Sequence, residues 1–318
     1  MNQEISEPLS QQLLETDKEL PLISVVVCTY NPENYLNLKE AVDSLVHQSY
    51  KVTEIIVVVD GVQTLADKIS TAYADHKNVK VIKTEKGLSI TQARNVGIRA
   101  AAGDIVAFTD DDAVPEKNWL ECLVDTYQKT NALAVGGKIL PIWLSGKPEH
   151  LPAELYWLVG VTHAGFAEEK VTEVRDAFGP NMSFKRAVFE KVGYFNENLG
   201  FSGRRTSYIQ GEEPEFGLRM KKRLGRGVIY SPKAVVYHKV TASKLKFEVL
   251  LNRSFYQGYS KALIQKMASP GALNTERSYL KKLFSRSTPS RTTKQTAVLL
   301  LCVLAVGLGF IYGRIKVK

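Results

Sequence analysis

Short runs of aliphatic and β-branched residues alternate with longer amphipathic segments over the first part of the chain. Four of these runs, at residues 22–29, 54–59, 79–83 and 104–109, have the length and composition of buried strands. Each is followed by a segment that favours a helix. Because strands that alternate with helices are joined by right-handed crossovers, the pattern predicts an α/β domain with a mostly parallel sheet.

Helix signals define three of these segments more closely. Asn31 can cap a helix whose first residue is Pro32, a position that does not need an amide hydrogen. The sequence Ser89-Ile-Thr-Gln92 is a capping box for a helix that we expect to stop at Gly103. Residues 115–129 are also expected to be helical, soon after three consecutive aspartates.

The alternation fades in the second half of the chain. Residues 141–172 are rich in loop-forming and aromatic residues. Two helices are expected at residues 185–192 and 212–224, and a last strand is expected at residues 228–240. The chain contains no internal repeat and no low-complexity tract.

These elements form one predicted domain at residues 21–240, with different segments on either side. Residues 1–20 are polar, have no apolar core and are predicted to be disordered. Residues 241–294 form a predicted basic, amphipathic, membrane-proximal region. Residues 295–313 are a predicted transmembrane or membrane-inserted helix, and 314–318 a basic tail. Because the apolar part is short, both a span of a thin membrane and a deep hairpin-like insertion remain open.

The net charge of +9 is concentrated in the C-terminal part of the chain. Fifteen of the 42 Lys and Arg residues, but only two of the 33 acidic residues, follow position 238. This charge adjoins an apolar segment, so it favours a membrane surface rather than nucleic acid. Because the heavier basic flank precedes that segment, the protein is expected in the cell membrane with its main domain on the cytoplasmic side. The three cysteines show no disulfide or metal spacing, which agrees with a reducing compartment.

Polar residues follow the ends of several predicted strands. Thr29 and Asn31 lie at the end of the first, Asp60 ends the second, and Asp110 to Asp112 end the fourth. Since ligands of open α/β sheets bind beyond the carboxyl ends of the strands, these side chains are expected along one edge. Three adjacent carboxylates repel one another unless a cation or a cation-bound phosphate neutralises them. The pattern predicts a nucleotide site, with Asp60 for base or ribose hydroxyls and the aspartate cluster for a metal-bound diphosphate.

Other residues have both a structural and a functional interpretation. Arg94 lies within a predicted helix. It is either part of an exposed polar face or a diphosphate contact, and its spacing in the sequence favours the exposed face. Glu212 and Glu213 begin a helix, where acids are favoured by its dipole, but a carboxylate there can also act as a general base. His238 is either a structural strand residue or the imidazole that completes a carboxylate metal site.

Six motifs occur in order along the chain. They are Val25-Val-Val-Cys-Thr-Tyr-Asn31, the Asp60 strand end, Gly87 through Ala93-Arg-Asn-Val-Gly97, Thr109-Asp-Asp-Asp112, Gly179-Pro-Asn-Met-Ser-Phe184, and Gly211-Glu-Glu-Pro-Glu-Phe-Gly-Leu-Arg219. As an ordered set, which covers about residues 20–240, they resemble the inverting family 2 glycosyltransferases. The resemblance implies the GT-A fold, a Rossmann-like mostly parallel sheet, here with a C-terminal membrane helix.

The resemblance also implies roles at the donor site. Asp60 would contact the nucleobase, Asp110 the ribose or nucleotide, and Asp112 the metal of an Asp-x-Asp motif. His238 is similar to a late histidine that joins the metal or diphosphate site in some of these enzymes. The metal would be Mg²⁺ or Mn²⁺, and it would stabilise the departing diphosphate of a UDP-sugar. The full set of expected donor-binding residues is Thr29, Asn31, Asp60, Arg94, Asp110 and Asp111.

The implied reaction is a single in-line displacement at the anomeric carbon, with Glu213 as the catalytic base. Glu213 occupies the position usually held by the aspartate of a Glu-Asp motif. This departure lengthens the base by one methylene group and leaves Glu212 as the alternative.

Two further segments, Pro152-Ala-Glu-Leu-Tyr-Trp-Leu-Val-Gly160 and Arg253-Ser-Phe-Tyr-Gln-Gly-Tyr-Ser-Lys261, resemble the archaeal glucosyl-dolichyl phosphate glucuronosyltransferases of protein N-glycosylation. This implies UDP-glucuronate as donor and a lipid-linked saccharide on dolichyl phosphate as acceptor. Arg204 or Arg205 is a hypothetical contact for the donor carboxylate or lipid phosphate, with an exposed loop as the alternative. Rival interpretations are a polyprenyl-phosphate monosaccharide synthase, a polysaccharide-assembly glycosyltransferase and a non-enzymatic anchored sugar-nucleotide-binding scaffold.

Overall fold

The computed structural model describes five stretches of the chain. These are residues 20–85, 87–200, 209–267, 271–283 and 291–316. Apart from Leu20, the N-terminal segment that is predicted to be disordered lies outside the described residues, and so do Arg204 and Arg205.

Four parallel strands form one half of the sheet. They are β1 (Ile23–Thr29), β2 (Glu54–Asp60), β3 (Val79–Thr84) and β4 (Ile105–Asp110), and between them lie η1 (Pro32–Asn34), α2 (Tyr35–Val46), α3 (Gln63–Ala72) and α4 (Ile90–Ala100). Their spatial order is β3-β2-β1-β4, which confirms the predicted parallel arrangement. Strands β1, β2 and β4 are almost fully buried because helices pack on both faces.

The other half of the sheet mixes strand directions. It contains β5 (Ala113–Pro115), β6 (Ala134–Trp143), β7 (Thr172–Val174), β8 (Met182–Lys185) and β9 (Val228–Val240). Strand β8 runs antiparallel between β4 and β6, β9 pairs in parallel with β6, and β5 and β7 pair antiparallel with β9. The last strand has the bounds that the sequence predicts.

Three sequence predictions need correction here. Residues 115–118 are not helical, since Pro115 ends the edge strand β5 and α5 (Trp119–Thr130) begins four residues later. Strand β6 ends and strand β7 begins within residues 141–172, the stretch that was expected to be loop. Helix α4 ends at Ala100 rather than Gly103, because the carboxylate of Glu54 accepts the Ala102 amide at 2.6 Å and holds the chain at the start of β2.

Two apolar clusters fill the two faces of the sheet. One contains residues of α2, α3 and α5, and the other contains residues of α4, α6 (Arg186–Val192) and α7 (Glu212–Leu224). The second cluster is centred on the rings of Phe184, Phe189, Phe195 and Phe216, whose neighbouring centroids are 4.8–6.0 Å apart. It supports the start of α7, where the two predicted candidate bases lie.

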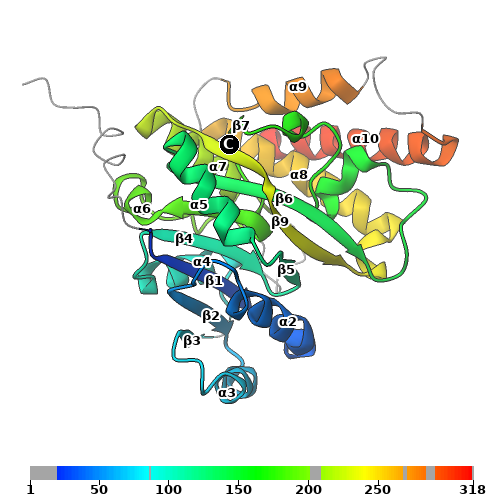
Figure 1. Ribbon diagram of the computed structural model, residues 1–318. Coiled ribbons are helices and arrows are strands. Elements are labelled where there is room, and N and C mark those ends of the chain that lie inside the picture. Colours follow the sequence, from blue (N-terminus) through cyan, green and yellow to red (C-terminus); the bar gives the residue numbers. More distant parts are fainter. Residues whose placement is uncertain (1–19, 86, 201–208, 268–270, 284–290, 317–318) are drawn as a thin grey trace, which may run out of the picture.

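The C-terminal part packs on one end of the sheet domain (Figure 1). It contains η5 (Ala242–Leu245), α8 (Phe247–Met267), α9 (Asn274–Leu283) and α10 (Thr293–Lys316). Helix α8 also contacts the short helix η2 (Ala153–Val159). Two other short 3-10 helices are η3 (Ala167–Glu169) and η4 (Gly179–Asn181). A third apolar cluster joins residues such as Leu155, Leu250 and Leu299 across η2, α8 and α10. Helix α10 is long and apolar enough to cross a membrane, and it extends beyond both ends of the predicted apolar helix.

Asn181 connects several elements at the centre of the fold. Its side chain is fully buried, accepts a hydrogen bond from the Trp119 indole at 2.8 Å and donates to the carbonyls of Lys138 and Ala234 at 2.9 Å each. These contacts join α5, β6 and β9 to the turn that precedes β8. The amide is therefore a polar crosslink where several elements meet.

We expect Asn181→Ala to lower the free energy of unfolding by roughly 3 kcal/mol, because two buried partners and one part-buried partner lose their hydrogen bond. Chemical denaturation of the full chain in detergent measures this change. The control is Asn118→Ala, an exposed position whose side chain makes no capping bond to α5. A loss no larger than that of the control would contradict the crosslink.

Candidate active site

One large cleft opens at the carboxyl edge of β1, β2 and β4. Its volume is about 1860 Å³, and it extends from the strand ends to α8, α9 and α10. All nine residues predicted from the sequence line it: Thr29, Asn31, Asp60, Arg94, Asp110, Asp111, Asp112, Glu213 and His238. Its volume exceeds that of an ordinary small-molecule pocket, so it can hold a nucleotide sugar together with part of a second substrate.

Asp110, Asp112 and His238 form a group that can hold a metal ion. One ligand atom from each residue lies within 4.8 Å of the others. The pairing of β5 with β9 causes this, because Ala113 lies opposite His238 and brings the strand histidine beside the aspartates. Two carboxylates and an imidazole fit Mg²⁺ or, better, Mn²⁺.

Lys244, in η5, supplies a positive charge in this group. Its Nζ lies 2.8 Å from Oδ2 of Asp112, and Nε2 of His238 lies 3.1 Å from Oδ1 of the same carboxylate. Burial alone would raise the pKa of Asp112, but the imidazole and the ammonium group hold that pKa well below its usual range. Asp112 is therefore ionised, and the protein already balances its charge.

Asp111 takes a different direction from its two neighbours. Its Oδ2 accepts a hydrogen bond from the Thr29 hydroxyl at 2.6 Å, which ties the cluster to the end of β1. Burial, followed by the nearby Asp112 charge, raises the pKa of Asp111 to about 7. The side chains of Thr29 and Asp111 therefore bind each other in the wall of the cleft.

Asp60 and Asn31 shape the loops beside the predicted nucleotide position. Asp60 accepts hydrogen bonds from the amides of Gly87 at 2.8 Å and Leu88 at 3.3 Å, just before α4. Gly87 has a φ of 108°, which favours glycine. Asn31 caps η1 by accepting the Glu33 amide at 3.1 Å, as the sequence predicts, although α2 itself begins later.

Arg94 is buried, so the expectation that it belongs to an exposed helix face is wrong. Its guanidinium lies 3.1 Å from Glu213, 3.3 Å from Glu212 and 3.5 Å from Asp110. Gly179 makes this approach possible, since a Cβ atom there would lie 2.1 Å from Nη2 of Arg94. The arginine connects the acidic start of α7 to the metal-binding group.

Glu212 and Glu213 are not equivalent. Glu212 is almost fully buried, and its Oε2 accepts the Gly211 amide at 3.0 Å, whereas Glu213 is more exposed to the cleft. Burial and the Glu212 charge raise the pKa of Glu213, and the nearby Arg94 partly opposes this effect. Glu213 is therefore the carboxylate better placed to exchange a proton with a substrate.

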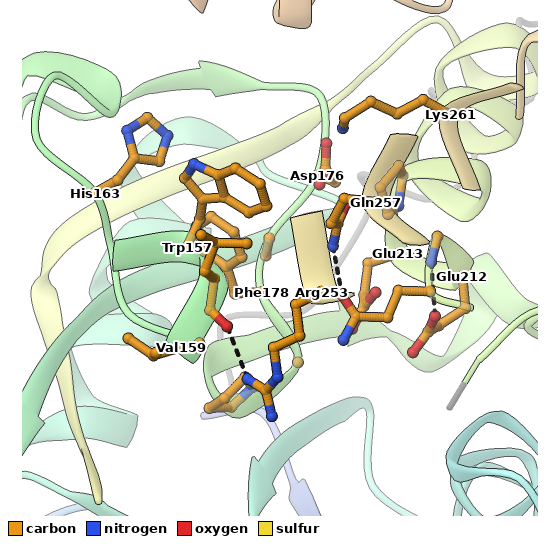
Figure 2. Close-up of a pocket in the computed structure, with 18 of the residues that line it drawn as sticks. Trp157, Val159, His163, Asp176, Phe178, Glu212, Glu213, Arg253, Gln257 and Lys261 are labelled. Carbon is orange, nitrogen blue, oxygen red and sulfur yellow. Dashed lines mark hydrogen bonds between the residues drawn. The ribbon is translucent and has the colours of Figure 1, made fainter. Parts of the chain in front are cut away.

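Helix α8 contributes a cleft wall that the sequence assignments did not include. Arg253, Gln257 and Lys261 recur at intervals of four and line the cleft that also contains Glu213 (Figure 2). The spacing places them on one helical face, a signal that could have been found in the sequence. No comparable pattern identifies Lys244, whose role depends on how η5 folds back towards Asp112.

The acidic cleft lies beyond the carboxyl ends of the parallel strands, which is where open α/β sheets bind their ligands. The model of the family described as glycosyl transferase family 2 matches residues 24–193. The chain belongs to this family and is a glycosyltransferase.

The comparisons also identify individual relatives. The chain is 37% identical over 303 residues to the glucosyl-dolichyl phosphate glucuronosyltransferase of Haloferax volcanii, covering 92% of this chain and 96% of the relative. The mannosyltransferase PcManGT of Pyrobaculum calidifontis has a TM-score of 0.59 at 17% identity, covering 95% and 92% of the two chains. S. aureus TarS 1-349 has a TM-score of 0.53 at 20% identity, covering 90% and 81%. The structural similarity confirms the predicted GT-A fold.

Lys244→Met should make Mn²⁺ bind about tenfold more tightly in the absence of nucleotide, because the ammonium group competes with the ion for Asp112. Electron paramagnetic resonance of free Mn²⁺ during a titration measures this. Lys246→Met, an exposed position in the same loop, is the matched control. Unchanged or weaker Mn²⁺ binding in the Lys244 variant would exclude this competition.

Proposed function

We propose that this chain is a membrane-anchored, inverting glycosyltransferase that transfers glucuronate from UDP-glucuronate to a saccharide on dolichyl phosphate. The reaction would belong to protein N-glycosylation and depend on Mg²⁺ or Mn²⁺. The name of the Haloferax volcanii relative, which matches nearly the full length of both chains, supports the donor and acceptor classes. The observation that carries the proposal is that Arg94 joins a metal-binding group to a candidate base in one cleft.

The donor side of the cleft is assigned to the strand ends. Asp110, Asp112 and His238 would hold the metal ion, which when bound stabilises negative charge on the departing diphosphate. Asp60 and the loop that it fixes would receive the nucleoside. Arg94, beside Asp110, adds a fixed positive charge on the same side.

The acceptor side is assigned to the start of α7. Glu213 would take the proton from the acceptor hydroxyl while the hydroxyl oxygen attacks the anomeric carbon of the donor sugar. A single displacement of this kind inverts the anomeric configuration. Glu212 holds the turn through the Gly211 amide and thereby positions its neighbour.

The side of the membrane follows from charge. Fifteen Lys and Arg residues but only two acidic residues follow position 238, and the cytoplasmic leaflet carries anionic lipids, so we assign the catalytic domain to the cytoplasmic side of the cell membrane. A polyprenyl-phosphate monosaccharide synthase is the main rival. Its acceptor would be a phosphate, which has no proton that must be removed by a strong base.

We expect Glu213→Gln to lower the transfer rate by at least about 10²-fold while UDP binding with Mn²⁺ stays unchanged. Radiolabelled transfer to extracted lipid acceptors and calorimetric UDP titration measure the two quantities. Glu212→Gln should retain more activity, and Glu248→Gln, an exposed position on α8, should behave as the unmodified chain. Nearly full activity of Glu213→Gln would refute a hydroxyl acceptor with this base.

The transfer rate should rise with pH through an apparent pKa above that of an ordinary glutamate, about 4.3. The reason is that burial and Glu212 favour the neutral form of Glu213, and only its ionised form can accept a proton. Arg94→Gln should move this pKa higher, because a stabilising cation is lost. Rates measured across pH test this, with Glu248→Gln as control; a profile that is already flat near the ordinary glutamate pKa would contradict it.

A further inference from the structure

Helix α10 is packed along α8 by direct backbone contact. A Cβ atom at Gly258 would lie 1.9 Å from the carbonyl oxygen of Val306, and one at Gly309 would lie 1.8 Å from that of Phe255. A Cβ at Gly313 would lie 2.8 Å from Ala262, so the contact continues towards the end of α10. The two helices form one unit, as Figure 1 also shows.

The opposite face of α8 cannot enter a hydrocarbon layer. It carries Arg253, Gln257 and Lys261 into the cleft that holds the candidate base, and Lys261 forms an ion pair with Glu276 at 2.9 Å. A helix that crossed the bilayer beside α8 would draw these groups into the membrane, where charged side chains are strongly disfavoured. The packing of α10 on α8 therefore opposes a perpendicular span.

The outer face of α10 is apolar along its length. Its inward residues Val298, Leu299 and Cys302 are buried against the rest of the protein. The exposed residues recur at intervals of about one turn and form what we term the leucine stripe: Leu300, Leu304, Leu308, Ile311 and Ile315, which are 51–64% exposed. Such a face needs an apolar partner.

We propose that α10 lies in the plane of the membrane and inserts its leucine stripe into a single leaflet, instead of crossing the bilayer. The partner is an anionic lipid surface, because Lys294, Arg314 and Lys316 flank the stripe and Lys281 and Lys282 are exposed on neighbouring α9. Basic residues at the two ends of an apolar helix occur on spanning helices too, so the in-plane orientation rests on the packing of α10 against α8.

This geometry has a consequence for the acceptor, which rests on the proposed function. Val306, Phe310 and Arg314 of α10 line the same cleft as Glu213, and exposed Arg277 of α9 lines it too. The cleft therefore opens at the level of the inserted helix. A lipid-linked saccharide can enter sideways from the leaflet, with its phosphate close to the two arginines.

Tag accessibility in sealed membrane vesicles tests the in-plane arrangement with the full chain. Epitopes before Met1 and after Lys318 should be cleaved by added protease on the same side of the membrane. A control chain with an oligoleucine segment of about 20 residues before the C-terminal tag should place its tags on opposite sides. Opposite sides for the chain without that segment would overturn the proposal.

A second measurement tests the leucine stripe itself. Leu304→Glu should reduce binding to phosphatidylglycerol-containing vesicles at least about tenfold, because its side chain must leave the acyl region. Leu36→Glu, on an exposed leucine of α2, should bind as the unmodified chain. Equal binding of both variants would overturn the proposal. UDP binding in detergent is independent of both measurements, so failure of the glycosyltransferase mechanism and failure of in-plane insertion give different results.

Discussion

The buried guanidinium of Arg94 is the interaction on which the cleft depends. It faces Glu212, Glu213 and Asp110, carboxylates that belong to segments more than a hundred residues apart in the chain. Without this cation, three acids would be held together in a poorly solvated site, and such uncompensated charge is costly. Gly179 leaves room for the guanidinium. The motif that contains this glycine is therefore needed for the charge balance of the site as well as for the backbone conformation.

The sequence predicts the parts of this structure that depend on neighbouring residues. The strands before Asp60 and Asp110 and the capping box of α4 follow from local periodicity and hydrogen-bonding chemistry. The antiparallel pairing of β5 with β9 and the insertion of β8 between β4 and β6 depend on partners far along the chain, which a local pattern does not contain. For the same reason the sequence does not reveal Lys244 beside Asp112 or the burial of Arg94, since mid-helix arginines are usually solvated.

In the proposed arrangement, helix α8 connects the cleft to the helix that faces the membrane. One of its faces carries Arg253, Gln257 and Lys261 into the cleft, and another receives the backbone of α10 through Gly258. Any displacement of α10 by lipids would therefore be transmitted to the cleft wall that α8 forms. In this arrangement, the pair of helices α8 and α10 determines both the membrane attachment and the shape of the proposed acceptor region.

The thickness of that pair bears on the choice between acceptors. If the leucine stripe lies in the leaflet, the lipid-facing side of α10 and the cleft-facing side of α8 are separated by the packed helices, each about 10 Å wide. A lipid phosphate at the head-group level would then lie near Arg277 and Arg314, which line the same cleft as Glu213. The cleft can therefore receive the phosphate and the reacting hydroxyl of the proposed acceptor at different points. In the proposed mechanism, this arrangement suits a saccharide hydroxyl, rather than the lipid phosphate, as the group that Glu213 would deprotonate.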